Sequence, residues 1–130
     1  MKLDAFTHAY IVAALWSSTD NSTPSGGNPL DDNYAATDIA PEALEQITQD
    51  CSRFQQAHAV LLAEAYSRYS VTDGSSPETY AGHDFWLTRQ GHGAGFWDRG
   101  LGEVGEKLTA AAHAVGGSDI YVGDDGELYV

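Results

Sequence analysis

The chain has 130 residues, and its 19 acidic side chains against six Lys and Arg produce a formal net charge of −13 at pH 7. This length suits a modest hydrophobic core, so we expect a single domain over residues 1–130. The charge argues against direct binding of nucleic acid or anionic lipid, and no stretch approaches the roughly 20 apolar residues that cross a bilayer.

The first residues and the cysteine content indicate a cytoplasmic protein. Asp4 lies close to the N-terminus, where a basic segment followed by an apolar run is missing, so we expect no secretory signal. The single cysteine, Cys51, excludes an intramolecular disulfide and a multi-cysteine zinc site. A reducing compartment is therefore expected.

Two helices are predicted in the first half of the chain. Residues 3–17 carry apolar side chains at helical spacing, and residues 18–33 form a loop rich in Ser, Thr, Asn, Gly and Pro. Residues 41–69 form one long helix, with Pro41 in its first turn and Asp38 as its cap. A continuous seam supports this helix, made by Leu44, Ile47, Cys51, Phe54, His58, Leu61 and Ala65. We interpret the cysteine of this seam as a buried hydrophobe and its histidine as an interface residue.

The most unusual segment runs from His83 to Arg99, after a second loop at residues 70–82. It holds two Phe-Trp pairs, two arginines, two histidines and three glycines. Side chains alternate in character over residues 83–88, which predicts a strand. Gly91-His92-Gly93 then predicts a turn, and residues 95–97 a second short strand.

The last third of the chain predicts a helix and a hairpin. Residues 101–115 have helical spacing of apolar side chains and end before Gly116-Gly117. Residues 119–122 and 127–130 are β-rich runs around Gly123-Asp124-Asp125-Gly126, a hairpin signal. The expected fold class is therefore α+β, with three helices packed against a small antiparallel sheet of about four strands.

The segment also offers a candidate metal or ligand site. His83, Asp84, His92 and Asp98 are a nitrogen and oxygen set that suits zinc, manganese or iron. No known ligand spacing is matched, and adjacent strand residues point to opposite faces. The structural alternative is that His83 and Asp98 form hydrogen bonds with backbone groups at the turn.

Catalysis and phosphate binding have weaker signals. No Gly-x-Ser-x-Gly motif is present, and Cys51 lies inside the helical seam, so we assign no catalytic residue. The glycines at 91, 93 and 95 lack the Gly-Lys-Ser/Thr ending of a phosphate loop, and their simpler interpretation is tight packing. We expect no cofactor.

Acidic residues are concentrated in two parts of the chain, while residues 81–110 are nearly balanced in charge. Such acids attract basic partners, although they also serve solubility alone. The candidate partner-binding residues are Asp31, Asp32, Asp38, Glu42, Glu45 and Asp50 in the first part and Asp119, Asp124, Asp125 and Glu127 in the second.

Several segments together resemble a family of small, acidic, uncharacterised proteins of bacteriophages and related mobile elements. The residues that carry the resemblance are Ala14-Leu15-Trp16-Ser17-Ser18-Thr19, Asn28-Pro29-Leu30-Asp31, the helix with Asp50-Cys51 and Phe54, the His83–Arg99 run, and Tyr121-Val122-Gly123-Asp124-Asp125-Gly126. The resemblance implies a phage origin and expression in a bacterial host. The family has no established activity, so the resemblance assigns no catalytic residue. An insertion after Trp16, Ser-Thr-Pro-Ser-Gly-Gly, is longer than the family pattern, which argues against a shared function of the first loop.

These observations favour an interaction protein over an enzyme. The first hypothesis is that the acids bind a basic host protein in the host cytoplasm, as a mimic of nucleic acid that inhibits a defence or nucleic-acid-processing protein. The alternative is a small domain centred on residues 83–99 that binds a metal or ligand, either as a binding module or as an enzyme. A structural accessory of the virion or of replication is a third class, and the oligomeric state stays open.

Overall fold

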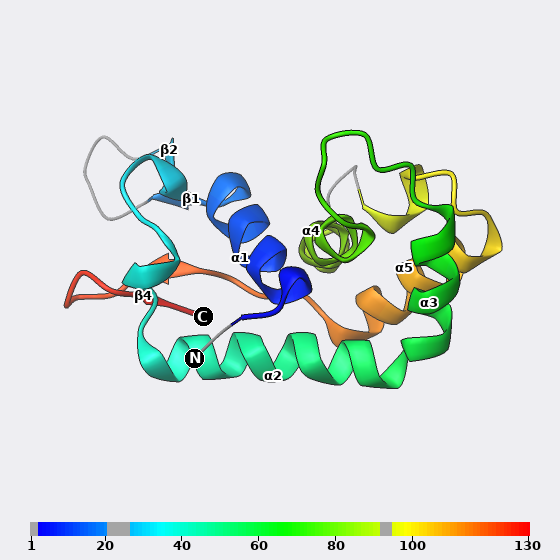
Figure 1. Ribbon diagram of the computed structural model, residues 1–130. Coiled ribbons are helices and arrows are strands. Elements are labelled where there is room, and N and C mark those ends of the chain that lie inside the picture. The colour runs from blue at the N-terminus through cyan, green and yellow to red at the C-terminus, as the bar shows by residue number, and fades with distance from the viewer. Residues whose placement is uncertain (1–2, 21–26, 92–94) are drawn as a thin grey trace.

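The structure, a computed structural model, describes residues 3–20, 27–91 and 95–130 and is mostly helical over them (Figure 1). Five α-helices lie in this part of the chain: α1 (Ala5–Ser17), α2 (Pro41–Ala57), α3 (Ala59–Arg68), α4 (Pro77–Arg89) and α5 (Glu103–Val115). Two small antiparallel sheets accompany them: β1 (Thr19–Asp20) with β2 (Asn28–Pro29), and β3 (Tyr121–Val122) with β4 (Leu128–Tyr129). The expected fold of three helices with one sheet of about four strands is therefore wrong.

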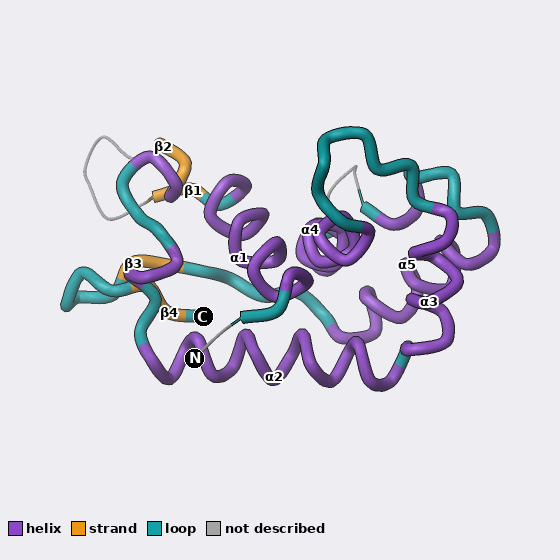
Figure 2. Tube along the Cα trace, in the orientation of Figure 1, coloured by secondary structure: helices purple, strands orange, loops and turns teal. Residues whose placement is uncertain are grey.

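Three short 3-10 turns complete the described secondary structure: η1 (Leu30–Asp32), η2 (Ala36–Asp38) and η3 (Phe96–Asp98). The first of these lies in the polar segment 18–33, which also contains β1 and β2. Figure 2 shows how little of the chain is strand. None of the helices in the described residues combines the length and the apolar character needed to span a bilayer.

The main departure from the sequence-based fold is α4. Residues 83–88 are helical, not a strand, and η3 replaces the second strand predicted at residues 95–97. The predicted turn at Gly91-His92-Gly93 falls largely on residues 92–94, outside the described part of the chain. The helix begins with Ser76, whose hydroxyl accepts a hydrogen bond from the Thr79 amide, and with Pro77 in its first turn. This start lies inside the segment 70–82 that was expected to be a loop.

The burial of α4 explains why the alternation of side chains at residues 83–88 wrongly predicted a strand. Six consecutive side chains, from Asp84 to Arg89, are buried, because α1, α3 and α5 all pack against this helix. A helix covered on all sides lacks the apolar stripe that marks a half-exposed helix. The alternation of polar and apolar residues therefore reflects polar side chains with buried partners, not the two faces of a sheet.

The predicted helix 41–69 is two helices. α2 ends at Ala57 and α3 begins at Ala59, and His58 between them has a non-helical backbone (φ −121°, ψ 29°). The chain changes direction there (Figure 1), so Leu62 is buried in place of the predicted Leu61. Asp38 does not cap α2, because its carboxylate accepts a hydrogen bond from the Ala35 amide and the cap residue is Ala40.

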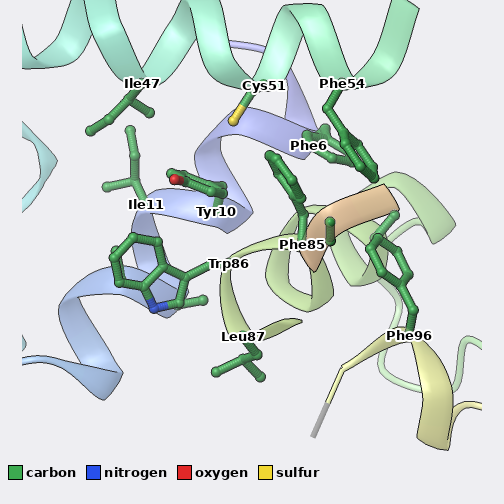
Figure 3. Packing of buried hydrophobic residues seen from close by; sticks show 14 of the residues in the cluster. Phe6, Tyr10, Ile11, Ile47, Cys51, Phe54, Phe85, Trp86, Leu87 and Phe96 are labelled. Atoms are coloured by element: carbon green, nitrogen blue, oxygen red, sulfur yellow. The ribbon is translucent and has the colours of Figure 1, made fainter. Parts of the chain in front are cut away.

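Aromatic side chains from four elements form the centre of the core (Figure 3). Phe54 of α2 stacks on Phe85 of α4 at 4.0 Å between ring centroids and lies 6.1 Å from Phe96 of η3. Phe6 and Tyr10 of α1 lie 5.8 Å and 5.4 Å from the same Phe85 ring. One Phe of the His83–Arg99 segment is thus the hub of the core, and the other closes its far side.

Candidate functional site

Most of the predicted partner-binding acids gather at one end of the molecule. The β3–β4 hairpin lies against the start of α2, where the Ala40 amide donates to the Leu128 carbonyl at 2.9 Å and Ile39 bridges Leu128. The segment with η1 and η2 lies at the same end (Figure 1). We call this surface the acidic end; its residues are Asp31, Asp32, Asp38, Glu42, Glu45, Asp124, Asp125 and Glu127.

The carboxylates of the acidic end are exposed apart from the half-buried Asp38. The hydroxyl of Tyr129 donates to Asp125 at 2.5 Å, and this bond, with nearby Glu42 and Glu127, raises the pKa of Tyr129 to about 12. Residues of α2 and of the hairpin therefore share one negative field. No Lys or Arg occurs at residues 27–46 or 116–130.

Two predicted acids lie elsewhere. Asp50 is half-buried farther along α2, and its carboxylate accepts a hydrogen bond from Arg89 at 3.0 Å. Arg89 also donates to the Tyr10 hydroxyl and to the Gly116 carbonyl, so it ties α1, α2 and the end of α5 to α4. Asp50 is therefore part of the core, whereas Asp119 is exposed on the segment that leads into β3.

The metal-site candidates do not form one cluster in the described chain. Asp84 is fully buried on α4, and its carboxylate receives Arg99 through Nε and Nη2 and the Tyr69 hydroxyl at 2.8 Å. Burial raises the pKa of Asp84, and these hydrogen bonds oppose the rise. Asp98 accepts the Gly95 amide in its own turn. No group of three or more His, Cys, Asp or Glu in the described residues is arranged to hold a metal ion.

His83 and His92 complete that candidate set. His83 is half-buried on α4 beside the ring of Trp16, and its Nδ1 has no hydrogen-bond partner in the described structure. Burial lowers the pKa of His83 because the imidazolium form loses solvation. His92 lies outside the described residues. His83 and Asp84 are adjacent in sequence, yet one lines a cavity and the other is enclosed by Arg99 and Tyr69.

Two cavities have residues of α1 in their lining, one along the helix and one at its C-terminal end. One, of about 340 Å³, is lined by His8, Val12, Tyr80, His83 and Arg99 among others. The other, of about 580 Å³, lies between the end of α1, the end of α4 and the segment before β3, and it contains Asp119. We call the second one the Asp119 cavity.

Two tyrosines that form hydrogen bonds with the buried charged side chains were not predicted from the sequence. Tyr10 and Tyr69 were not singled out, although each hydroxyl bonds to a buried charged side chain. The available signal was the position of Asp84 and Arg89 in a run of apolar residues, because buried charges need partners. Arg99 pairs with Asp84, and its guanidinium carbon lies 5.0 Å from the centroid of the Tyr80 ring. Asp98 follows the structural alternative, because it accepts a hydrogen bond from a backbone amide in its own turn.

The thiol of Cys51 is buried, as expected from the sequence. It is fully buried between α2 and α1, and burial raises its pKa to about 12. A thiol with so high a pKa is not a nucleophile near neutral pH.

No protein-family model, no curated protein and no solved structure matches this chain. Its charge distribution and its cavities therefore stand as the features on which a function can be argued.

Proposed function

We propose that this protein is an acidic interaction protein whose acidic end binds a basic surface of a host protein. The observation that carries the proposal is the gathering of eight carboxyl side chains, from η1, η2, α2 and the hairpin, in a region without Lys or Arg. Opposite charge at such a surface speeds encounter and selects the partner.

The distribution of ion pairs supports this use of the acids. Four ion pairs are formed in the described structure, Arg68–Glu64, Arg89–Asp50, Arg99–Asp84 and Lys107–Glu103, and none involves the acidic end. Uncompensated like charges in one place disfavour the folded state. A basic partner would remove that repulsion when it binds.

The partner class follows from the charge pattern and from the resemblance to phage proteins. A host defence or nucleic-acid-processing protein carries a basic groove for phosphates, which a row of carboxylates can occupy. The setting would be the cytoplasm of the infected bacterium, and the effect inhibition by exclusion of the nucleic acid. This identification rests on analogy and on charge.

Affinity capture from a bacterial lysate, followed by mass spectrometry, identifies the partner. Capture at about 0.05 M salt should recover a basic nucleic-acid-binding protein, and about 0.5 M salt should release it, because screening weakens contacts between exposed charges. The purified partner should then lose its nucleic acid as this protein is added. Retention of the partner at high salt, or simultaneous binding of nucleic acid, would contradict the proposal.

Two matched variants separate the acidic end from net charge alone. The acidic-end variant carries Glu42→Gln, Glu45→Gln, Asp124→Asn and Glu127→Gln, and the control variant carries Gln at Glu64, Glu78, Glu103 and Glu106. Both lose the same number of negative charges. The acidic-end variant should bind the purified partner at least about tenfold more weakly, and the control variant by less than about threefold. Equal losses would mean that bulk charge, not the acidic end, drives binding.

A further inference from the structure

The Asp119 cavity has a chemical character that the acidic end alone does not explain. Three segments line it: Ser17, Ser18 and Thr19 after α1, Trp86 and Gln90 at the end of α4, and Ser118 to Val122 before β3. The Ser118 amide donates to Gln90 Oε1 at 3.4 Å, which holds the last two segments together. In Figure 2 the segment from α5 to β3 crosses α1 in projection, and the cavity lining places Ser118 to Val122 beside the end of α1.

Several polar side chains of this cavity have no partner within the described residues. The side chains of Ser18, Thr19, Ser118 and Asp119 have no hydrogen bond or ion pair within the described residues. Ser17, by contrast, is occupied, since its hydroxyl receives the Trp86 indole N–H at 2.7 Å and donates to the Ala13 carbonyl. The cavity therefore offers hydroxyl oxygens and one carboxylate that can accept hydrogen bonds, and one donor, because the Nε2 amide group of Gln90 is buried without a partner.

The electrostatics of the cavity favour a cation. None of its lining residues is Lys or Arg, and Asp119 supplies a negative charge. The C-terminal ends of α1 and α4 both lie at its wall, and a helix carries partial negative charge at that end. A phosphate or carboxylate ligand would be repelled by Asp119 and by the two helix ends, with no Lys or Arg in the lining to offset them.

An aromatic ring connects this cavity to the acidic end. Tyr121 is 53 % exposed and lines the Asp119 cavity. The same residue also lines a neighbouring cavity of about 320 Å³ with Asp124, Asp125 and Tyr129. A chain that fills the first cavity can thus continue over Tyr121 onto the acidic hairpin. A planar cation gains further energy when it lies on such a ring.

We propose that the Asp119 cavity binds the guanidinium group of an arginine side chain supplied by the basic partner. The inference rests on the proposed function and specifies the contact: Asp119 and the free hydroxyls accept the N–H groups, Tyr121 covers the planar face, and neighbouring basic residues of the partner lie along the acidic end. Arginine fits better than lysine because it presents five donors in a flat fork.

A small probe tests the cavity without the partner. N-acetyl-arginine amide, titrated into the ¹⁵N-labelled protein, should shift the backbone amides of Thr19, Ser118, Asp119 and Tyr121 with a millimolar Kd. N-acetyl-citrulline amide has nearly the same shape without the charge, and it should cause no saturable shift. Asp119→Asn should weaken binding of the arginine probe by about fivefold, whereas Asp124→Asn, which removes the same charge outside the cavity, should change it by less than twofold.

Several results would overturn the inference. These are equal binding of the citrulline probe, equal effects of the two Asp variants, or saturable binding of D-ribose at the same amides, which would make the cavity a polyol site.

Partner binding separates the two proposals. If Asp119→Asn binds the purified partner normally while the acidic-end variant does not, the cavity assignment is wrong and the acidic-end function stands. If neither variant loses affinity, both are wrong.

Discussion

At the scale of single residues, Asp84 shows how α4 tolerates a buried charge. Its side chain is completely buried, and Arg99 and the Tyr69 hydroxyl occupy both carboxylate oxygens. Arg99 comes from the loop after η3 and Tyr69 from the end of α3, so one carboxylate joins three segments. Such a pair stabilises weakly as a whole, yet the loss of one partner leaves an uncompensated charge.

Asp84→Asn should therefore lower the free energy of unfolding by about 3 kcal/mol, because Arg99 loses its counter-charge. The loss is limited because part of the Arg99 side chain remains exposed to solvent. Urea denaturation followed by circular dichroism measures the change. Glu64→Gln is the matched control, because it breaks the exposed Arg68–Glu64 pair of α3 and should cost less than about 1 kcal/mol. Similar losses in the two variants would show that Asp84 has no special structural role.

At the scale of elements, the crossing of α1 and α4 depends on a glycine, Gly82, at the point of contact. A Cβ at Gly82 would lie 1.9 Å from the carbonyl oxygen of Phe6, so the two backbones are in direct contact there. This close approach brings Phe6 and Tyr10 against Phe85. The sequence shows the glycine but not the helix that passes over it.

Gly82→Ala should destabilise the protein by about 3 kcal/mol, because the new methyl group meets backbone and not a flexible side chain. Gly117→Ala is the control, since its Cβ would find its nearest neighbour at an ordinary 3.6 Å, the Arg89 carbonyl oxygen. Thermal unfolding of both variants measures the contrast. A stable Gly82→Ala protein would mean that α1 and α4 cross differently.

Some elements were predicted correctly from the sequence, and α4 was not. The helix predicted at 3–17 is α1, the helix at 101–115 is α5, and the terminal hairpin is present in shorter form as β3 and β4. These predictions are confirmed because their signals are local: helical spacing, Gly116 at a helix end, and a glycine-flanked turn. α4 was missed although Ser76-Pro77-Glu78 is a proper helix start, because its buried polar residues hid the helical period.

At the scale of the whole molecule, positive charge is confined to one part of the described chain, whereas negative charge occurs throughout it. The Lys and Arg side chains of the described residues, Arg53, Arg68, Arg89, Arg99 and Lys107, lie on α3, α4, α5, the second half of α2 and the loop after η3. The acidic end has none. Repulsion within that end should therefore be a measurable cost to stability.

Raising NaCl from about 0.01 M to about 0.5 M should increase the Tm of the protein by a few degrees, because screening relieves this repulsion. The acidic-end variant should start with a higher Tm at low salt and respond to salt about half as strongly. The control variant should keep the full salt response. Differential scanning calorimetry measures all three, and an unchanged response in the acidic-end variant would show that its carboxylates do not interact.

Composition and local spacing were enough to predict the net charge, the two acidic regions, α1, α5 and the hairpin, because each depends on composition or on neighbours within a few residues. It also marked His83–Arg99 as exceptional, and Phe85 and Phe96 of that segment pack in the centre of the core.

Folding in three dimensions determined which of these parts meet. It brought the hairpin to the start of α2, separated Asp50 from the other acids by pairing it with Arg89, and formed the cavity around Asp119. It also placed residues 83–88 in a helix whose buried polar residues, Asp84 and Arg89, find their partners on segments far away in the sequence. Long-range pairing of buried polar groups leaves no local periodic pattern, and so could not be read in advance.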